Sequence, residues 1–328
     1  MIEQVLPQIY RIEIPLPHNP LQTLNSYFIR GGERNLLIDT GFNQPQCLAA
    51  QLKAKAELGF DMENTDILVT HAHSDHTGLV HRLVKPGAKV FCDAYTGANL
   101  ANGLDATWHY FRELNRQSGL QDLQLADHPG YKYAPQPLGP VTVLHDGDTL
   151  SVGDHRFRCL STPGHAPDHL CLYEPRHKIL FSGDHILGNI TPNNTLWDAP
   201  WTVKRDLLGE YLANLDRVAT LDIAIALPGH RSLIYDCHIR IAELKLHHQQ
   251  RLKDILRILG DAKMNGCQVA SRMPWSMRLA SWEDFPATQK MFATGEALSH
   301  LAHLVFRNIL AKELIDGVVY YSRLTNAA

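Results

Sequence analysis

Apolar and polar positions along the first 235 residues predict short strands that alternate with amphipathic helices. Segments such as Tyr10–Ile14 and Asn35–Ile38 have the apolar character of strands, whereas Pro45–Leu58 opens on a proline and repeats apolar residues along one helical face. A second series of strands, with Gly-Asp turns, runs from about residue 141 to residue 181, and a helix and another strand follow. Two β-rich halves with helices predict an α/β fold of αββα type, in which two sheets pack face to face and helices cover their outer faces.

From about residue 238 the pattern becomes helical. Long amphipathic runs occupy Ile239–Leu259 and Glu296–Ile315, a short helix is expected over Phe285–Phe292, and Val318–Leu324 alternates like a strand. Helices followed by a small β element predict a separate lobe of winged-helix type. We therefore divide the chain into a larger α/β domain over residues 1–237 and a small helical, winged-helix-like domain over residues 238–328.

Two segments are candidates for the walls of a site. Residues 103–140 show no regular pattern, contain several Pro and Gly, and carry aromatic residues that include Trp108 and Tyr131. A connection of this length is usually a functional loop or a disordered one. Residues 191–201 add Trp197 and Trp201. Such aromatic surface suits an acyl chain or a thioester as well as an unstacked base, and ordinary packing is the alternative.

Composition narrows the class of protein. A chain of 328 residues with 45% hydrophobic residues can bury a sizeable core, and a net charge of −3 argues against a molecule that binds nucleic acid over its whole surface. The six cysteines form no CxxC pair, no run approaches 18 apolar residues, and the first residues do not resemble a secretory signal. We therefore expect a reduced, cytoplasmic protein that does not span a membrane.

The 19 histidines include a cluster with the spacing of metal ligands. His71, His73, Asp75 and His76 follow an apolar run within six residues, in the order HAHSDH. Burying four polar side chains would require a partner for each, whereas a loop that leaves a strand can aim alternate side chains at adjacent cations. Imidazole nitrogen and carboxylate oxygen are ligand types that zinc prefers.

Three further fragments place a candidate ligand after an apolar run and a glycine. They are TPGH, which ends at His165, FSGDH, which contains Asp184, and LPGH, which ends at His230. Glycine allows a tight backbone turn beside a site. Each fragment is weak evidence alone, but seven ligands in this order fit two metal ions better than one.

The order H-x-H-x-D-H, followed by a distant His, Asp and His, resembles the metallo-β-lactamase superfamily. Its αββα fold agrees with the pattern above and would cover about residues 5–235. The resemblance implies that one metal is held by His71, His73 and His165. It implies a second metal held by Asp75, His76 and His230, with Asp184 as the ligand that bridges the two. It implies two zinc ions, with iron or manganese as alternatives, and Asp rather than Cys at position 184 is similar to the glyoxalase II and ribonuclease branches.

The resemblance also implies a mechanism, in which a hydroxide that bridges the metals attacks the substrate and Asp75 helps to move the proton. Asp39 resembles the carboxylate that hydrogen-bonds a ligand imidazole in this family. Asp168, His169 and His185 lie next to ligand positions, where they could contact substrate or a carboxylate. We expect the remaining twelve histidines to have ordinary surface or helix-face roles.

The FSGDHILG and TPGHAPDH segments, with the C-terminal lobe, resemble the lactamase-beta-2-like hydrolases, which include endoribonucleases and polyketide thioesterases. Residues 238–328 carry twelve Lys and Arg against eight Asp and Glu, a net +4, which leaves −7 for the rest of the chain. An acidic catalytic part without an obvious phosphate-binding surface favours a small ester or thioester, as in hydroxyacylglutathione hydrolase. Two alternatives stay open: a zinc-dependent endoribonuclease that binds single-stranded RNA, and a metal-containing ligand sensor whose winged helix contacts DNA. The C-terminal lobe packs either on the catalytic domain or on a second subunit, so a homo-oligomer is a further alternative.

Overall fold

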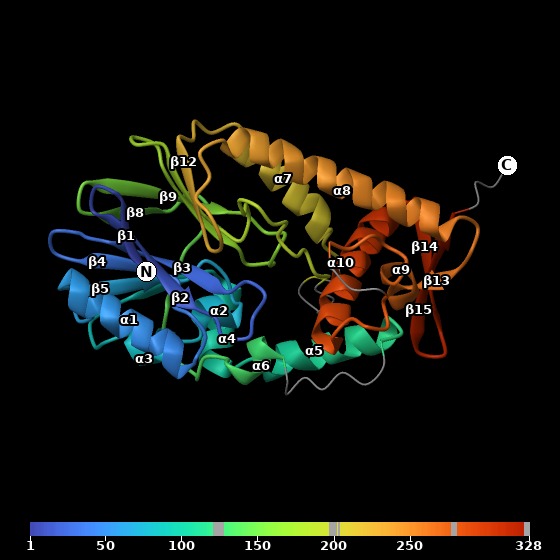
Figure 1. Cartoon of the computed structure of the whole chain (residues 1–328), viewed down its shortest axis with the longest axis horizontal. Coiled ribbons are helices and arrows are strands. Elements are labelled where there is room, and N and C mark those ends of the chain that lie inside the picture. Colours follow the sequence, from blue (N-terminus) through green and yellow to red (C-terminus); the bar gives the residue numbers. More distant parts are fainter. Residues whose placement is uncertain (121–127, 197–201, 203, 277–280, 325–328) are drawn as a thin grey trace.

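Two β-sheets form the centre of the larger part of the molecule in the computed structural model, which describes residues 1–120, 128–196, 202, 204–276 and 281–324 (Figure 1). The first sheet has the strand order β1 (Ile2–Leu6), β2 (Ile9–Pro15), β3 (Thr23–Ile29), β4 (Asn35–Ile38), β5 (Thr65–Leu68), β6 (Val90–Cys92) and β7 (Thr142–Val143). The second has the order β12 (Ile225–Pro228), β11 (Ile179–Gly183), β10 (Leu170–Glu174), β9 (His155–Ser161) and β8 (Thr149–Val152). Strands β4 to β7 are parallel to one another, and so are β11 and β12.

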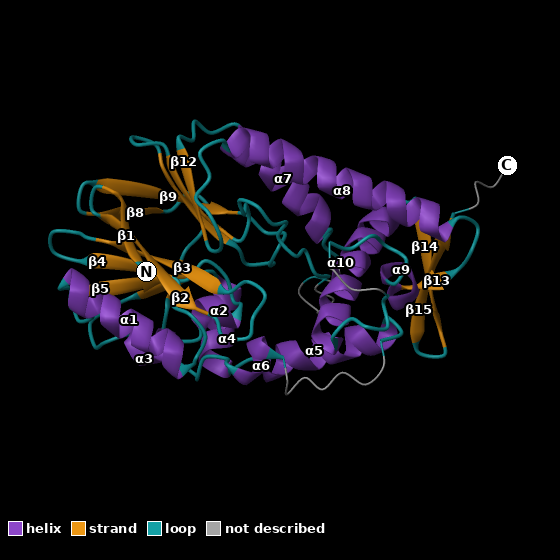
Figure 2. Ribbon diagram, viewed as in Figure 1, coloured by secondary structure: helices purple, strands orange, loops and turns teal. Residues whose placement is uncertain are grey.

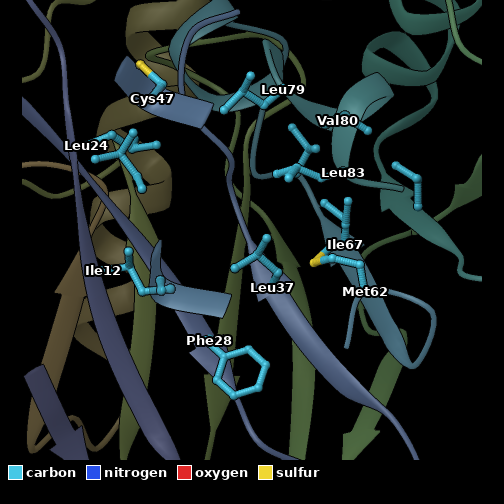
Figure 3. Packing of buried hydrophobic residues seen from close by; sticks show 14 of the residues in the cluster. Ile12, Leu24, Phe28, Leu37, Cys47, Met62, Ile67, Leu79, Val80 and Leu83 are labelled. Carbon is cyan, nitrogen blue, oxygen red and sulfur yellow. The ribbon is translucent and has the colours of Figure 1, made fainter. Parts of the chain in front are cut away.

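Side chains alternate along the strands of the first sheet, so that one face packs against helices and the other against the second sheet. Phe28 and Leu37 point from the first sheet toward α1 (Pro45–Leu58) and α3 (Val80–Leu83), and Figure 3 shows them in the same apolar cluster as Leu79 and Leu83. Their neighbours on the same strands, which include Tyr27 and Ile38, face the second sheet. The outer face of the second sheet is covered by α7 (Leu207–Ala219) and by the first half of α8 (Cys237–Leu259). The expected helix, sheet, sheet, helix order is thus what the structure has.

The segment 103–140 is not the irregular loop that the sequence pattern indicated. After α4 (Ala94–Asn102), residues Asp105–Gln117 form α5 and Pro129–Lys132 form the single turn α6. Within α5, Glu113 bonds Arg116 and Gln117 one turn ahead, which stabilises the helix locally. Only a narrow stripe of α5 packs inward. The many polar and aromatic residues on the rest of the helix obscure the apolar periodicity by which a helix is predicted from sequence.

The C-terminal part contains α9 (Gly266–Ala270), α10 (Ala287–Phe306) and a small sheet of order β13 (Met264–Asn265), β15 (Val318–Arg323) and β14 (Leu310–Ile315) (Figure 2). These elements share an apolar core with the second half of α8 and with Leu114 of α5. Helix α8 therefore contributes to two cores, through Leu244 in one and Leu259 in the other. The division at residues 237 and 238 stays a prediction.

Two expectations for the C-terminal part are wrong. Helix α10 is one continuous helix rather than two. Gly295 lies where this helix approaches the Thr195 side chain, and a Cβ there would lie 2.8 Å from Thr195 Cγ2. The expected helix over Glu296–Ile315 ends at Phe306, and Leu310–Ile315 is a strand. Asp316 and Gly317 both have positive φ and form the two-residue turn of a β-hairpin, not the end of a helix. Among the described residues, no helix is both long and apolar enough to cross a membrane.

Candidate metal centre

The seven predicted ligands converge at one edge of the sandwich, where strands of both sheets end. The loop after β5 carries His71 and His73, and α2 (Ser74–Thr77), which follows it, carries Asp75 and His76. His165 follows β9, Asp184 follows β11 and His230 follows β12. Parallel strands end on the same side of a sheet, which brings ligands that are distant in sequence together.

One half of the cluster contains three imidazoles. Nδ1 of His73 lies 2.9 Å from Nε2 of His71 and 3.1 Å from Nε2 of His165. Oδ2 of Asp184 lies 3.7 Å from the same nitrogen of His165. These ligand atoms are close enough to surround one cation, since the three imidazole nitrogens all lie within 4.8 Å of one another.

The other half contains two imidazoles and a carboxylate. Nε2 of His230 lies 3.3 Å from Oδ2 of Asp75 and 3.5 Å from Oδ2 of Asp184. Nε2 of His76 lies 3.9 Å from Oδ2 of Asp75 and 3.7 Å from Oδ1 of Asp184. Asp184 therefore borders both halves.

The buried atoms of this cluster lack protein partners. Nε2 of His76, Nε2 of His230 and Oδ1 of Asp184 are inaccessible to solvent and accept or donate no hydrogen bond. Leaving such atoms unpaired is costly, and buried polar groups in proteins nearly always have a partner. Imidazole nitrogen and carboxylate oxygen are also the donor types that divalent cations of the zinc class bind. The residues present fit a divalent metal.

Asp39 forms a hydrogen bond with a candidate ligand. Its Oδ2 accepts a hydrogen bond of 2.7 Å from Nδ1 of His76, so Nε2 is the nitrogen of that ring that faces the centre. Both oxygens of Asp39 also accept from Thr70, from the backbone N–H and from the hydroxyl, at 2.9 Å each. Since the Thr70 hydroxyl donates to Asp39, it can accept from Nδ1 of His71 at 3.0 Å. One carboxylate thus sets the orientation of two imidazoles.

Backbone carbonyls orient two further imidazoles. Nδ1 of His165 donates to the carbonyl of Asn193, and Nδ1 of His230 donates to the carbonyl of Thr23, at 2.7 Å each. A carbonyl only accepts, so the proton lies on Nδ1 and Nε2 faces the centre. The sequence does not reveal either partner, because every residue has a backbone carbonyl and no particular residue type marks the contact.

Electrostatics differ between the two halves. Burial holds the pKa of His73 down to about 3, so this imidazole is neutral. Burial would also lower the pKa of His76, but the carboxylates of Asp39, Asp184 and Asp75 outweigh burial and raise it well above its usual value. The half around His76 therefore holds the negative charge that would stabilise a cation.

Asp168 and His169 hold the loops that carry ligands. Oδ2 of Asp168 accepts from the backbone N–H of Ala72, at 2.9 Å, and from the hydroxyl of Thr96. Burial raises the pKa of Asp168 to about 7. Nε2 of His169 accepts from the backbone N–H of Asp184 at 3.0 Å. Each residue fixes the backbone next to a candidate ligand.

His185 has a different environment. Its ring lies against Tyr211 of α7, with ring centroids 5.1 Å apart, and neither ring nitrogen has a hydrogen-bond partner. Burial lowers the pKa of His185 to about 3. Its contacts belong to the core beneath the site.

A hydrogen-bonded chain connects the site to the C-terminal helices. The Asn194 amide donates to Nε2 of His248 at 3.2 Å, and Nδ1 of His248 donates to Nε2 of His300 at 3.0 Å. Nδ1 of His300 ends the chain by donating to the Glu296 carbonyl at 2.8 Å. Because this carbonyl can only accept, every proton in the chain has one position. Asn194 is next to Asn193, whose carbonyl orients His165.

Both histidines of this chain were expected to have ordinary roles. They lie on different helices, 52 residues apart, so no local spacing reveals the pair. Burial lowers the pKa of His300 to about 4 and that of His248 well below its usual value, and both rings are therefore neutral at pH 7.

Aromatic residues of the segment 103–140 lie beside α2. The Ser74 hydroxyl donates to the Gly130 carbonyl at 2.5 Å. The Trp108 ring packs against the rings of His128 and Tyr131, with centroids 4.9 Å and 5.7 Å away. His128 was also expected to be ordinary, whereas burial lowers its pKa to about 4. The other predicted wall residues, Trp197 and Trp201, lie outside the described residues.

Known proteins resemble this chain in sequence and in fold. Residues 21–230 match the model of the metallo-beta-lactamase superfamily. The crystal structure of a metallo-beta-lactamase family protein from Thermus thermophilus superposes with a TM-score of 0.84 at 28% identity, over 98% of this chain and 100% of that one.

Curated relatives are fungal proteins. The lactamase-like protein adaB of Aspergillus niger is 29% identical over 79% of this chain and 66% of its own length, so this chain spans slightly less than two thirds of that relative. An atrochrysone carboxyl ACP thioesterase of Aspergillus fumigatus is 27% identical over 79% of this chain and 67% of its own length.

Proposed function

This chain belongs to the metallo-beta-lactamase superfamily, and we propose that it is a hydrolase, namely a dinuclear zinc enzyme that cleaves a small ester or thioester. The convergence of seven His and Asp side chains from both sheets carries this proposal. His71, His73 and His165 would hold one ion, and the second ion would be held by Asp75, His76 and His230. Asp184 would bridge them, because its Oδ2 lies 3.7 Å from His165 Nε2 and 3.5 Å from His230 Nε2.

Cations bound in this way supply Lewis acidity and lower the pKa of water, which provides a nucleophile near neutral pH. The chain's own residues orient the ligands and handle the proton. The Asp75 side chain is 12% exposed, whereas those of His76 and His230 are fully buried. Asp75 is thus the group through which we expect a proton to pass between the reacting centre and the leaving group.

The substrate class is supported by a relative and by the surroundings of the site. The fungal relative is named as a thioesterase that acts on an acyl carrier protein. The aromatic residues Trp108 and Tyr131 lie on the segment that contacts α2 through Ser74. Aromatic surface can accommodate the apolar part of an acyl group. From the same features we infer that this chain belongs to the branch of the superfamily that contains the lactamase-beta-2-like and glyoxalase II-like hydrolases.

We further infer that residues 238–328 form a winged-helix-like lobe. Helices α9 and α10 precede the hairpin of β14 and β15, and the apolar core that they share with the second half of α8 and with Leu114 supports this interpretation. In the proposed enzyme this lobe stabilises the segment that orients His165, through Asn194 and His248.

Turnover assays can test the proposed chemistry. Zinc-loaded protein is assayed against acyl carrier protein and glutathione thioesters, simple esters and labelled single-stranded RNA. We expect hydrolysis of thioesters or esters, and cleavage of RNA alone would refute the proposed substrate class.

Asp75→Ala should lose at least about 100-fold in kcat, since a positioned acid or base contributes that much or more. The exposed control Asp261→Ala should keep full activity, and an equally active Asp75→Ala would refute the role of Asp75.

A further inference from the structure

A second group of potential ligands lies at the other end of the second sheet. His155 begins β9, Glu174 ends β10, and His177 lies in the turn between β10 and β11. Strands β9 and β11 both run from this end toward His165 and Asp184. The length of β10, roughly 14 Å at 3.4 Å per residue, therefore separates this group from the catalytic cluster.

The three side chains are arranged like metal ligands. One donor atom of each lies within 4.8 Å of the donor atoms of the other two. Nδ1 of His177 is 3.0 Å from Oε2 of Glu174, and the rings of His155 and His177 have centroids 5.3 Å apart. Donor atoms around a tetrahedral zinc ion are about 3.3 Å apart, so only a small movement would close the group. The His177 side chain is 45% exposed and lies in a turn, where it has room for that movement.

Burial and unmet bonding distinguish this group from an ordinary surface ion pair. The Glu174 side chain is only 2% exposed, and His155 is 8% exposed. Nδ1 of His155 is buried and has no hydrogen-bond partner. Oε2 of Glu174 accepts from the backbone N–H of His177 at 2.6 Å. The atom that still needs a partner is Nδ1 of His155, because a buried polar atom without one is costly. Lys178, which follows His177 in the sequence, is itself paired with Asp222.

We propose that His155, Glu174 and His177 bind a divalent cation of the zinc class, separately from the catalytic cluster. Two imidazole nitrogens and one carboxylate oxygen are a common zinc ligand set, and the exposed side of His177 leaves a fourth position for water. The cation would join the start of β9 to the turn after β10 and stabilise this end of the sheet. The proposal does not depend on the proposed hydrolase activity.

Zinc counting tests this site. Wild type, His177→Asn and the exposed control His145→Asn are dialysed to equilibrium against buffered zinc, and zinc per chain is measured by mass spectrometry. We expect His177→Asn to lose one zinc per chain and to keep turnover, with no loss in His145→Asn. Glu174→Gln, which keeps the size of the side chain, should also lose one zinc.

A second measurement is needed to show where the lost zinc ion was bound. Zinc-edge anomalous diffraction from zinc-saturated crystals should show a peak among the three side chains in wild type. Equal zinc counts in wild type and His177→Asn, the same loss in His145→Asn, or no peak at this position would each refute the proposal. His71→Ala should lose catalytic zinc but keep this peak, so a failure of the catalytic proposal can be distinguished from a failure of this one.

Discussion

Asp39 occupies a strained position that serves the candidate metal centre. Its φ is +57°, a left-handed conformation that Asp and Asn tolerate better than most residues. In this conformation the carboxylate reaches both Thr70 and His76. The single residue therefore joins the end of β4 to the loop that follows β5.

Asp39→Asn should weaken zinc binding about 10-fold to 100-fold, which is the usual cost of losing such a partner of a ligand imidazole. The amide still accommodates the left-handed backbone and still accepts from Thr70, but it cannot supply the negative charge beside His76. Chelator competition measures the dissociation constant of zinc, with the exposed Asp261→Asn as the control. Unchanged zinc affinity in Asp39→Asn would contradict this role.

The residues that could be predicted from sequence are those with a local signal. His71 to His76 follow one strand directly, and His165, Asp184 and His230 each follow a glycine at the end of another. His248 and His300 give no such signal, because their contact depends on how α8 packs against α10. Sequence patterns report what lies along one element and are nearly silent about what two distant elements bring together.

The same distinction holds for whole elements. A clear apolar period predicts the element, and β4 and α1 have the residues expected for them. The period of α5 is obscured by its polar and aromatic positions, and strand β14 was mistaken for a helix because its hairpin partner follows it. In both cases packing against a later segment decides the structure.

The segment 193–196 depends on two helices for its position. Asn194 bonds α8 through His248, and the N–H of Leu196 donates to the carbonyl of Gly295 in α10 at 3.1 Å. Asn194→Ala should lower the free energy of unfolding by about 1–3 kcal/mol, because it leaves Nε2 of His248 buried without a donor. Urea denaturation measures this change.

Asn194→Ala should also loosen the carbonyl of Asn193 that orients His165. We expect faster amide hydrogen exchange in residues 190–196 and weaker zinc binding. Asn64→Ala, at an exposed position, is the matched control. Unaltered exchange and unaltered zinc affinity in Asn194→Ala would show that α8 and α10 do not position this segment.

At the scale of the whole molecule, buried neutral histidines predict sensitivity to acid. The pKa of His128 and of His300 is about 4, against 6.5 for an ordinary histidine, because both rings are buried. The unfolded chain takes up protons below about pH 6.5 that the folded chain binds only near about pH 4. Their contribution to stability is therefore complete above pH 6.5 and is lost as the pH falls toward 4.

For His300 alone this contribution is up to about 3 kcal/mol. Urea denaturation at a series of pH values, with a chelator present, should show the free energy of unfolding fall across that window. His300→Gln should show a flatter dependence on pH than wild type. An equal slope for the two proteins would contradict a neutral His300 in the folded chain.

The hydrogen bonds that connect the segment 193–196 to His248 and His300 also constrain when the site can be completed during synthesis. A nascent chain has displayed all seven candidate ligands once His230 has emerged from the ribosome, yet His248 and His300 have still to follow. The segment that orients His165 has no support on its outer side until then. We therefore expect metal loading in the mature geometry to follow the synthesis of α10. Protein that is translated without zinc should still take up zinc afterwards.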